Sequence, residues 1–297
     1  MSLVINHNMM AANTARNLNS HYAALSKSTQ RLSTGLRVNS AADDAAGLAI
    51  RELMRTDIAA LQQGVRNAND AISLIQTADG ALGVIDEKLT RMKELAEQAA
   101  TGTYDSTQRL MIDSEYQAMA SEITRIANAT DFNGIKLLDG SLSSSTHDGS
   151  GLEATGQLKV HFGTMNDSDE DYYYIQIGTS TASALGVGNS AAEGSMAYTV
   201  STQNAAQSAL VGINNAVVSK DAIRAHLGAL QNRLENTISN LTTQAENLQA
   251  AESRISDVDV ATEMTNFVRN QILTQSAVAM LSQANSMPQM AMQLIGG

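Results

Sequence analysis

The sequence contains no cysteine and no tryptophan, and its only proline is Pro288. Without cysteine the chain can form neither a disulfide nor a thiolate metal site, and it has no thiol nucleophile. Proline interrupts helices, so a chain with one proline near its end has few barriers to long helices. Aromatic residues make up 3% of a chain that is 43% hydrophobic. The apolar content therefore lies in alanine, leucine, isoleucine and methionine, which suit helix–helix seams better than a thick globular core.

Basic residues are scarce: 19 lysines and arginines stand against 30 aspartates and glutamates, for a net charge of −11. This balance argues against a nucleic-acid partner, which needs a basic face. No run of about 18 apolar residues is present, so we expect no membrane span. Residues 1–18 lack the basic, apolar and small-residue regions of a Sec signal peptide, so export would need another route.

The longest regular pattern runs from Ala206 to Ile255. Its apolar residues recur in steps of three and four, with a mean of about 3.5, which is typical of a coiled-coil seam: Leu227, Leu230, Leu234, Ile238, Leu241, Ala245, Leu248 and Ile255. A fifty-residue helix would span roughly 75 Å, too long to bury its seam alone. We therefore predict a mainly α fold: an elongated antiparallel helical rod or coiled coil formed by the N- and C-terminal segments, with a small β-hairpin region in the middle.

Similar seams occur elsewhere in the chain. One lies near the N-terminus, one over residues 45–100, one over residues 106–130 and one after Arg254. Gly35 and Asn39-Ser40 should end the first helix. Ser40, Asp43 or Asp44 can cap the second helix, and Asp105 or Ser106 can cap the third, which should stop at the turn signal of residues 131–134.

The character of the sequence changes between about residues 135 and 205. Residues 158–162 and 172–177 are rich in β-formers and predict a hairpin, and residues 196–200 predict a further strand. The expected organisation is an N-terminal inner-core helix (1–44), the N-terminal part of an outer rod (45–138), an outward loop and hairpin region (139–205), a C-terminal rod helix (206–256) and a C-terminal inner-core helix (257–297).

No pattern for catalysis or cofactor binding is found. The five histidines (His7, His21, His147, His161 and His226) show no metal-ligand spacing. Asp43-Asp44 is better explained as a helix cap than as a metal site, and the acidic residues of 167–171 as a solvated turn rather than a calcium loop. Nucleophile-elbow and phosphate-loop motifs are absent. We expect no catalytic residue, cofactor or metal, and hence no enzyme.

Two long motif-bearing regions resemble bacterial flagellin. The N-terminal motifs are RLSTGLRVNSAADDAAGLAI (31–50) and RNANDAISLIQTADGAL (66–82). The C-terminal motifs are ENLQAAESRISDVDVATEM (246–264) and NQILTQSAVAMLSQAN (270–285), followed by Pro288-Gln289. The resemblance covers roughly residues 1–138 and 205–297 and matches both ends in order and spacing.

The resemblance implies a secreted, extracellular filament subunit whose main partner is itself. It further implies unfolded export through the flagellar type III apparatus, an export chaperone on the C-terminal helix, and contacts with filament cap and hook-associated proteins. The residues expected to matter for assembly lie on the two terminal seams: Leu18, Tyr22, Leu25, Leu32, Leu36, Met264, Phe267, Val268 and Ile272. The alternative for each is packing within one subunit.

By the same resemblance, the helix around Leu89–Gln98 corresponds to a surface that a host Toll-like receptor recognises in many flagellins. The matching residues are Arg91, Leu95 and Gln98, with Glu115 on a neighbouring helix. Thr90 departs from the glutamine often found at its position. The alternative is an ordinary solvated helix face.

Three other functions are weighed against a filament subunit. A hook–filament junction protein shares the terminal helices but is a minor component. A coiled-coil signalling or translocator protein would need a membrane span or an output module. A filament-associated hydrolase would need a catalytic constellation.

Overall fold

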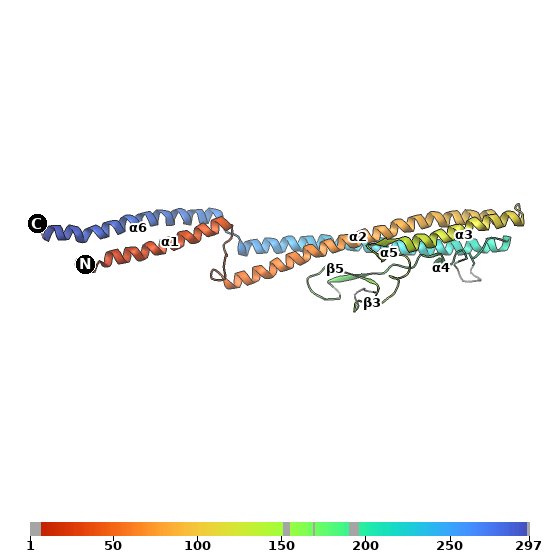
Figure 1. The fold of residues 1–297 in the computed structure, drawn as a ribbon, viewed down its shortest axis with the longest axis horizontal. Helices are drawn as coiled ribbons and strands as arrows, with labels where there is room; N and C mark the ends of the chain where they lie inside the picture. The colour runs from red at the N-terminus through yellow and green to blue at the C-terminus, as the bar shows by residue number, and fades with distance from the viewer. Residues whose placement is uncertain (1–6, 151–154, 169, 190–195, 296–297) are drawn as a thin grey trace. The chain divides into compact units, whose positions relative to one another are not determined.

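The computed structural model describes residues 7–150, 155–168, 170–189 and 196–295 (Figure 1). The helices are α1 (Met9–Thr34), α2 (Ala45–Ala100), α3 (Ser106–Ala129), α4 (Ala182–Leu185), α5 (Gln203–Ser256) and α6 (Val260–Ile295). The strands are β1 (Asp131–Phe132), β2 (Ile135–Lys136), β3 (His147–Asp148), β4 (Thr155–Gly156), β5 (Leu158–His161) and β6 (Tyr172–Ile175). The mainly α fold with central antiparallel hairpins is confirmed. The chain forms two compact units, one of residues 1–58 and 246–297, the other of residues 59–245.

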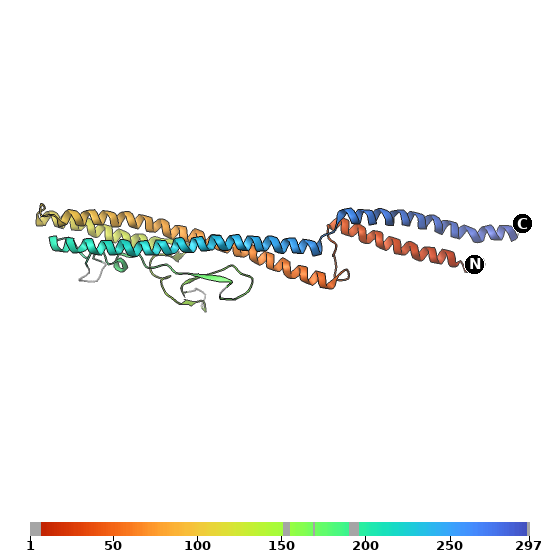
Figure 2. The same ribbon diagram turned by 180° about the vertical axis from the view of Figure 1, so that it is seen from behind.

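The first unit is built on the pairing of α1 with α6. The side-chain amide of Asn8 donates to the carbonyl of Ala284 (2.7 Å), while Arg31, at the other end of α1, faces Glu263 at 3.6 Å. These two contacts fix an antiparallel register, and both ribbon views show the helices side by side (Figures 1 and 2). The expected pairing of the terminal helices is therefore confirmed.

The ends of these helices are set by local sequence. The side-chain oxygen of Asn8 accepts from the backbone N–H of Ala11 and caps the start of α1. Gly35 ends α1 in the left-handed region (φ 72°), which favours glycine. The carboxylate of Asp44 accepts from the N–H of Gly47 in the first turn of α2, as expected of a cap.

The segments that follow α1 and α5 are joined to each other. Leu36 and Asp257 form an antiparallel bridge, and Arg37 donates from its backbone to the carbonyl of Ser256 (2.7 Å). The N–H of Val258 in turn donates to the carbonyl of Gly35 (3.0 Å). These backbone bonds hold the base of the α1–α6 pair.

The second unit contains the long parts of α2 and α5 together with α3. Asp79 pairs with Arg224 and Asp86 with Lys220, so α2 and α5 run antiparallel, as Figure 2 also shows. The buried apolar residues of α2 form its core, and from Ala68 onward they recur mostly every three or four positions: Leu61, Ala68, Ala71, Leu74, Ile75, Ala78, Leu82, Ile85, Leu89, Met92, Leu95, Ala96 and Ala99. The regular seam predicted for this helix is confirmed.

A glycine in α2 allows a hairpin to approach closely. Strands β5 and β6 pair antiparallel, with Val160 opposite Tyr173. A Cβ on Gly64 would lie 2.0 Å from the carbonyl oxygen of Phe162, at the end of β5. One turn away, the Asn67 amide donates to the carbonyl of His161 (2.8 Å). The expected hairpin is confirmed, and Gly64 and Asn67 dock it on α2.

The strand expected at residues 196–200 is not formed. Its backbone groups bind side chains of α3 instead: Tyr116 donates to the carbonyl of Ala197 (2.7 Å), and the N–H of Val200 donates to Asp113 (2.8 Å). Gln117 likewise donates to the carbonyl of Tyr198. Among the described residues, backbone pairing here is limited to a single bridge between Val187 and Ala197, and side chains of α3 bind most of the other backbone groups named here.

Candidate assembly surface

The seam between α1 and α6 is filled mainly by small and polar residues. The most buried residues on the two helices are Ser28, Glu263, Thr274, Ala277 and Ala284. Such residues let two helix backbones approach closely but bury little apolar area. The pair therefore gains little hydrophobic stabilisation from its own seam.

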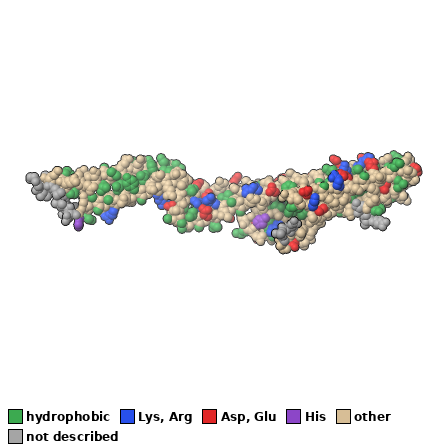
Figure 3. Space-filling view, in the orientation of Figure 1, with side chains coloured by type: hydrophobic (Ala, Val, Ile, Leu, Met, Phe, Trp, Pro, Cys, Tyr) green, Lys and Arg blue, Asp and Glu red, His purple; other side chains and the backbone are tan. Residues whose placement is uncertain are grey.

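Large apolar residues of α6 point away from the seam. Val260, Met264, Val268 and Ile272 are all exposed and recur every four residues, so they form a continuous row on one side of the helix. Ile272 is 57% exposed and Met264 is 45% exposed. Leu273, Val278, Met280 and Met290 extend the apolar surface along α6. In the space-filling view, hydrophobic side chains gather over the terminal helices (Figure 3).

The residues expected to mediate assembly divide into two groups. Tyr22, Met264, Val268 and Ile272 are exposed, whereas Leu18, Leu25, Leu32, Leu36 and Phe267 are half-buried. The exposed group is available to a second molecule. The half-buried group is partly covered within one chain, and Leu36 among it lies beyond α1, in the bridge with Asp257.

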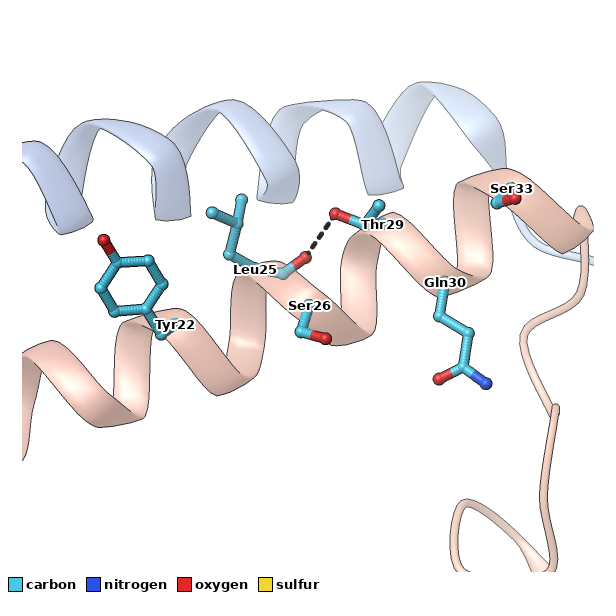
Figure 4. Close-up of a pocket in the computed structure, with 6 residues that line it drawn as sticks. All are labelled: Tyr22, Leu25, Ser26, Thr29, Gln30 and Ser33. Atoms are coloured by element: carbon cyan, nitrogen blue, oxygen red, sulfur yellow. Dashed lines mark hydrogen bonds between the residues drawn. The ribbon is translucent and has the colours of Figure 1, made fainter.

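A shallow groove of about 530 Å³ runs along α1. Its lining residues are Tyr22, Leu25, Ser26, Thr29, Gln30 and Ser33. In Figure 4, Tyr22, Leu25 and Thr29 are drawn toward α6, and Ser26 and Gln30 away from it. The hydroxyl of Thr29 donates to the carbonyl of Leu25 (2.9 Å), so it is satisfied within the helix. The groove therefore combines the apolar side chain of Leu25 with hydroxyl and amide side chains.

Two carboxylates, those of Asp43 and Asp259, form hydrogen bonds near the end of α1 and the start of α6. Lys27 on α1 lies 2.6 Å from Asp43, and its hydrogen bond lowers the pKa of that carboxyl to about 2. Asp259 caps α6: its carboxylate accepts from the Thr262 hydroxyl (2.7 Å) and from the N–H of Ala261 (3.0 Å). These hydrogen bonds lower the pKa of Asp259, and the bond from the Thr262 hydroxyl has the largest effect. The carboxylates therefore stay ionised at neutral pH and fix the helix ends.

The residues expected at a receptor surface lie in the second unit. Arg91 donates to Glu115 (2.8 Å) and to Glu94 (2.9 Å). Both hydrogen bonds raise the pKa of the guanidinium, and the bond to Glu115 has the larger effect. Gln98 donates to the hydroxyl of Tyr104 (3.0 Å). Arg91, Gln98 and Glu115 are exposed.

Leu95 does not share this surface. It is 1% exposed, because it belongs to the same buried face of α2 as Met92 and Ala99. Its expected part in direct receptor contact is therefore corrected: its side chain packs in the core and supports the helix from inside.

The described residues show neither a metal-ligand cluster nor a membrane-spanning helix. In the ranges given above, no group of three or more histidine, cysteine, aspartate or glutamate side chains could hold a metal ion. None of the helices in those ranges is long and apolar enough to cross a membrane. Asp169, part of the acidic run considered for calcium, lies outside the described residues. Asp171 accepts from the backbone N–H of Asp167 (2.8 Å) and so organises this turn.

Comparison with known proteins identifies the family. Residues 5–143 match the model of the bacterial flagellin N-terminal helical region, and residues 191–295 match that of the C-terminal helical region. The chain belongs to the bacterial flagellin family. The flagellin of Bacillus subtilis (strain 168) is 43% identical over 309 residues, covering 98% of this chain and 99% of that protein. Flagellin FlaB2 of Treponema pallidum (strain Nichols) is 39% identical over 293 residues, covering 99% of this chain and all of that protein.

A solved structure shows the same fold at much lower identity. It is a protein of Vibrio parahaemolyticus provisionally assigned as flagellar hook-associated, with a TM-score of 0.55 and 13% identity. The match covers 72% of this chain and all of that one. At this identity the likeness concerns the fold alone.

The sequence interpretation missed part of the apolar surface. Val260, Leu273 and Val278 are exposed on α6 but were not among the expected assembly residues. The four-residue repeat from Val260 to Ile272 was a usable signal. It was hidden because α6 carries apolar residues on every side, so spacing alone did not show which line faces α1.

Proposed function

We propose that the chain is a structural subunit that self-assembles into the bacterial flagellar filament for swimming motility. The observation that carries this proposal is the arrangement of the terminal helices, which meet through small and polar residues and leave large apolar residues outside. Fully burying one exposed isoleucine or methionine side chain contributes about 1.5–3 kcal/mol. The four residues of the row are about half exposed, so covering each contributes about half of that, and the row as a whole favours association. Exposed apolar rows of this kind mark interaction surfaces.

Membership of the family supports a second copy of this chain as the partner that covers the exposed apolar row. Close relatives are named flagellins or flagellar filament core proteins, and they match along nearly their whole length. A contact between different surfaces of identical subunits does not close on itself and propagates as a helical filament. We place residues 1–44 and 257–297 in its inner core, residues 45–138 and 206–256 in its outer rod, and residues 139–205 on its outer side.

This function includes an extracellular location and several transient partners. We propose unfolded export through the flagellar type III apparatus, with an export chaperone that covers the C-terminal helix beforehand. The absence of cysteine supports it, because no disulfide can lock the chain before it leaves the cell. The filament cap and hook-associated proteins would contact the same apolar ends of the subunit.

Recognition by a host Toll-like receptor is proposed for the exposed residues Arg91, Gln98 and Glu115. The salt bridges of Arg91 hold its guanidinium in a fixed position on α2, which reduces the ordering cost of an interface. This role would belong to the host and not to the filament.

A hook–filament junction protein is the second candidate, and it is not favoured, because the curated relatives are named flagellins or flagellar filament core proteins. Two truncations test the filament role. Removing residues 1–20 shortens α1, and removing residues 278–297 shortens α6. Either truncation should leave helical protein that stays in the supernatant after seeding. Long filaments from either truncated chain would refute the assignment of assembly to the terminal helices.

A further inference from the structure

The apolar surface of α6 contains oxidisable side chains. Among the described side chains of this helix, Met264, Met280 and Met290 are exposed, at 45%, 58% and 47%. Met264 lies within the row formed with Val260, Val268 and Ile272. In contrast, Met92 in the core of the second unit has no exposed surface. The free subunit therefore presents thioethers to solvent on the surface assigned to assembly.

We propose that Met264, Met280 and Met290 are modification sites at which peroxide controls entry of the subunit into the filament. The inference rests on the proposed function, since it concerns regulation of the same surface. The thioether sulfur attacks one oxygen of hydrogen peroxide, the O–O bond breaks, and the products are one methionine sulfoxide and one water. The sulfur loses two electrons and the peroxide gains them, so the reaction needs no other reactant.

The physical consequence follows from the neighbours of the sulfur. A sulfoxide is polar and accepts hydrogen bonds, and water satisfies it in the free subunit. When a second copy covers the row, the sulfoxide of Met264 would lie among the side chains of Val260, Val268 and Ile272, which donate no hydrogen bond. An unsatisfied polar group is costly to bury, so an oxidised subunit should be rejected.

The exposure of these sulfurs in the free subunit explains why oxidation would regulate the subunit before assembly. Packing between subunits removes solvent from these sulfurs, and buried methionines react slowly because reaction depends on access. Filaments should therefore resist peroxide concentrations that oxidise free subunits. Methionine sulfoxide reductases reverse the modification and would return the subunit to the assembly-competent pool.

The test compares peroxide-treated and untreated full-length subunits in seeded assembly, with peptide mass spectrometry to locate each sulfoxide. We expect oxidation at the three α6 methionines to raise the critical concentration about tenfold or more, the effect of one unsatisfied polar group. Reductase treatment should restore assembly. The variant Met264→Leu/Met280→Leu/Met290→Leu keeps side-chain volume, and its critical concentration is compared with and without peroxide. That concentration should rise less on peroxide treatment than the critical concentration of the wild-type subunit does.

A matched control uses Met165, which is exposed in the connection between β5 and β6. Met165→Leu should leave the sensitivity to peroxide unchanged, whereas Met264→Gln should weaken assembly without any oxidant. Unchanged assembly of subunits shown to be oxidised at the α6 sites would overturn the proposal, as would equal inhibition of the triple leucine variant. Failure of untreated subunits to assemble would instead refute the proposed function, and it would refute the proposed regulation as well.

Discussion

The Nζ of Lys220 on α5 lies 2.5 Å from the carboxylate of Asp86 on α2 and 2.8 Å from that of Asp221. The lysine side chain is only 2% exposed, whereas both carboxylates reach solvent. Burial disfavours the charged amine, but the hydrogen bonds to Asp221 and Asp86 outweigh this effect and raise the pKa of Lys220. Lys220, whose aliphatic chain is buried and whose amine is paired with Asp86, thus joins the two long helices.

Lys220→Ala should lower the free energy of unfolding by about 1–3 kcal/mol, because it removes a packed stem and a charged hydrogen-bond donor together. Lys220→Met should cost less, since it keeps most of the buried volume. The matched control is Lys93→Ala, which removes an exposed lysine whose amine donates to Asn214. Urea unfolding followed by circular dichroism measures all three, and equal midpoints for the two alanine variants would contradict this account.

Gly64→Ala should release the β5–β6 hairpin from α2. The added methyl group would lie 2.0 Å from the carbonyl oxygen of Phe162, so helix and hairpin must separate, at a cost of about 1–3 kcal/mol. Gly80→Ala is the control, because nothing lies within 4 Å of its Cβ and alanine favours a helix by about 0.5–1 kcal/mol. Hydrogen exchange of residues 158–175 should rise for the first variant only. If both variants protect the hairpin equally, the close approach at Gly64 is not what docks it.

Stability of the first unit should fall in acid. The pKa of Asp43 is lowered from 3.8 to about 2 in the folded chain, mainly by the hydrogen bond from Lys27. The unfolded chain therefore takes up the proton at higher pH than the folded chain. The contribution of this pair is complete above about pH 4 and is lost as the pH falls toward 2. Thermal unfolding between pH 6 and pH 2 should show this loss.

Asp43→Asn and Lys27→Met provide the controls for the acid transition. Each removes one partner, so each should make the melting temperature depend less on pH in that window than it does in the wild type. Profiles that remain parallel for the wild type and both variants would show that the Lys27–Asp43 pair does not contribute to acid sensitivity.

Arg91→Ala should reduce activation of the receptor without preventing filament formation. It removes the guanidinium that bridges Glu94 and Glu115 on the exposed face of α2. Arg125→Ala, which removes an exposed arginine paired with Glu122 on α3, is the matched control. A reporter assay on cells with the receptor measures the effect. Loss of activation in both variants, or in neither, would argue against recognition at Arg91.

The long helices were predictable because their buried residues repeat every three or four positions without proline. The orientation of α6 was not predictable in the same way. Its buried residues include Glu263 and Thr274, while Val268 and Ile272 are exposed, which reverses the usual rule that apolar residues face inward. The small and polar residues that face α1 allow close approach, and under the proposed function the exposed apolar residues contact a second copy of the chain.

Two other differences between the sequence predictions and the structure have local causes. Leu95 has the spacing of the α2 core, and the family resemblance alone placed it on a receptor surface. Residues 196–200 have the composition of a strand, but Asp113, Tyr116 and Gln117 of α3 supply their hydrogen bonds. A single sequence does not show which helix side chains will reach a distant backbone, so the number of strands was overestimated there.

In the proposed filament, copies of this chain cover one another's exposed terminal helices. Electron microscopy of purified full-length subunits, after seeding or salting-out at neutral pH, tests it most directly. We expect long, uniform filaments from the wild type and none from Ile272→Asp, which places a charge in the exposed row of α6. Wild-type subunits that keep their helical circular dichroism but stay monomeric, or Ile272→Asp subunits that form normal filaments, would contradict it.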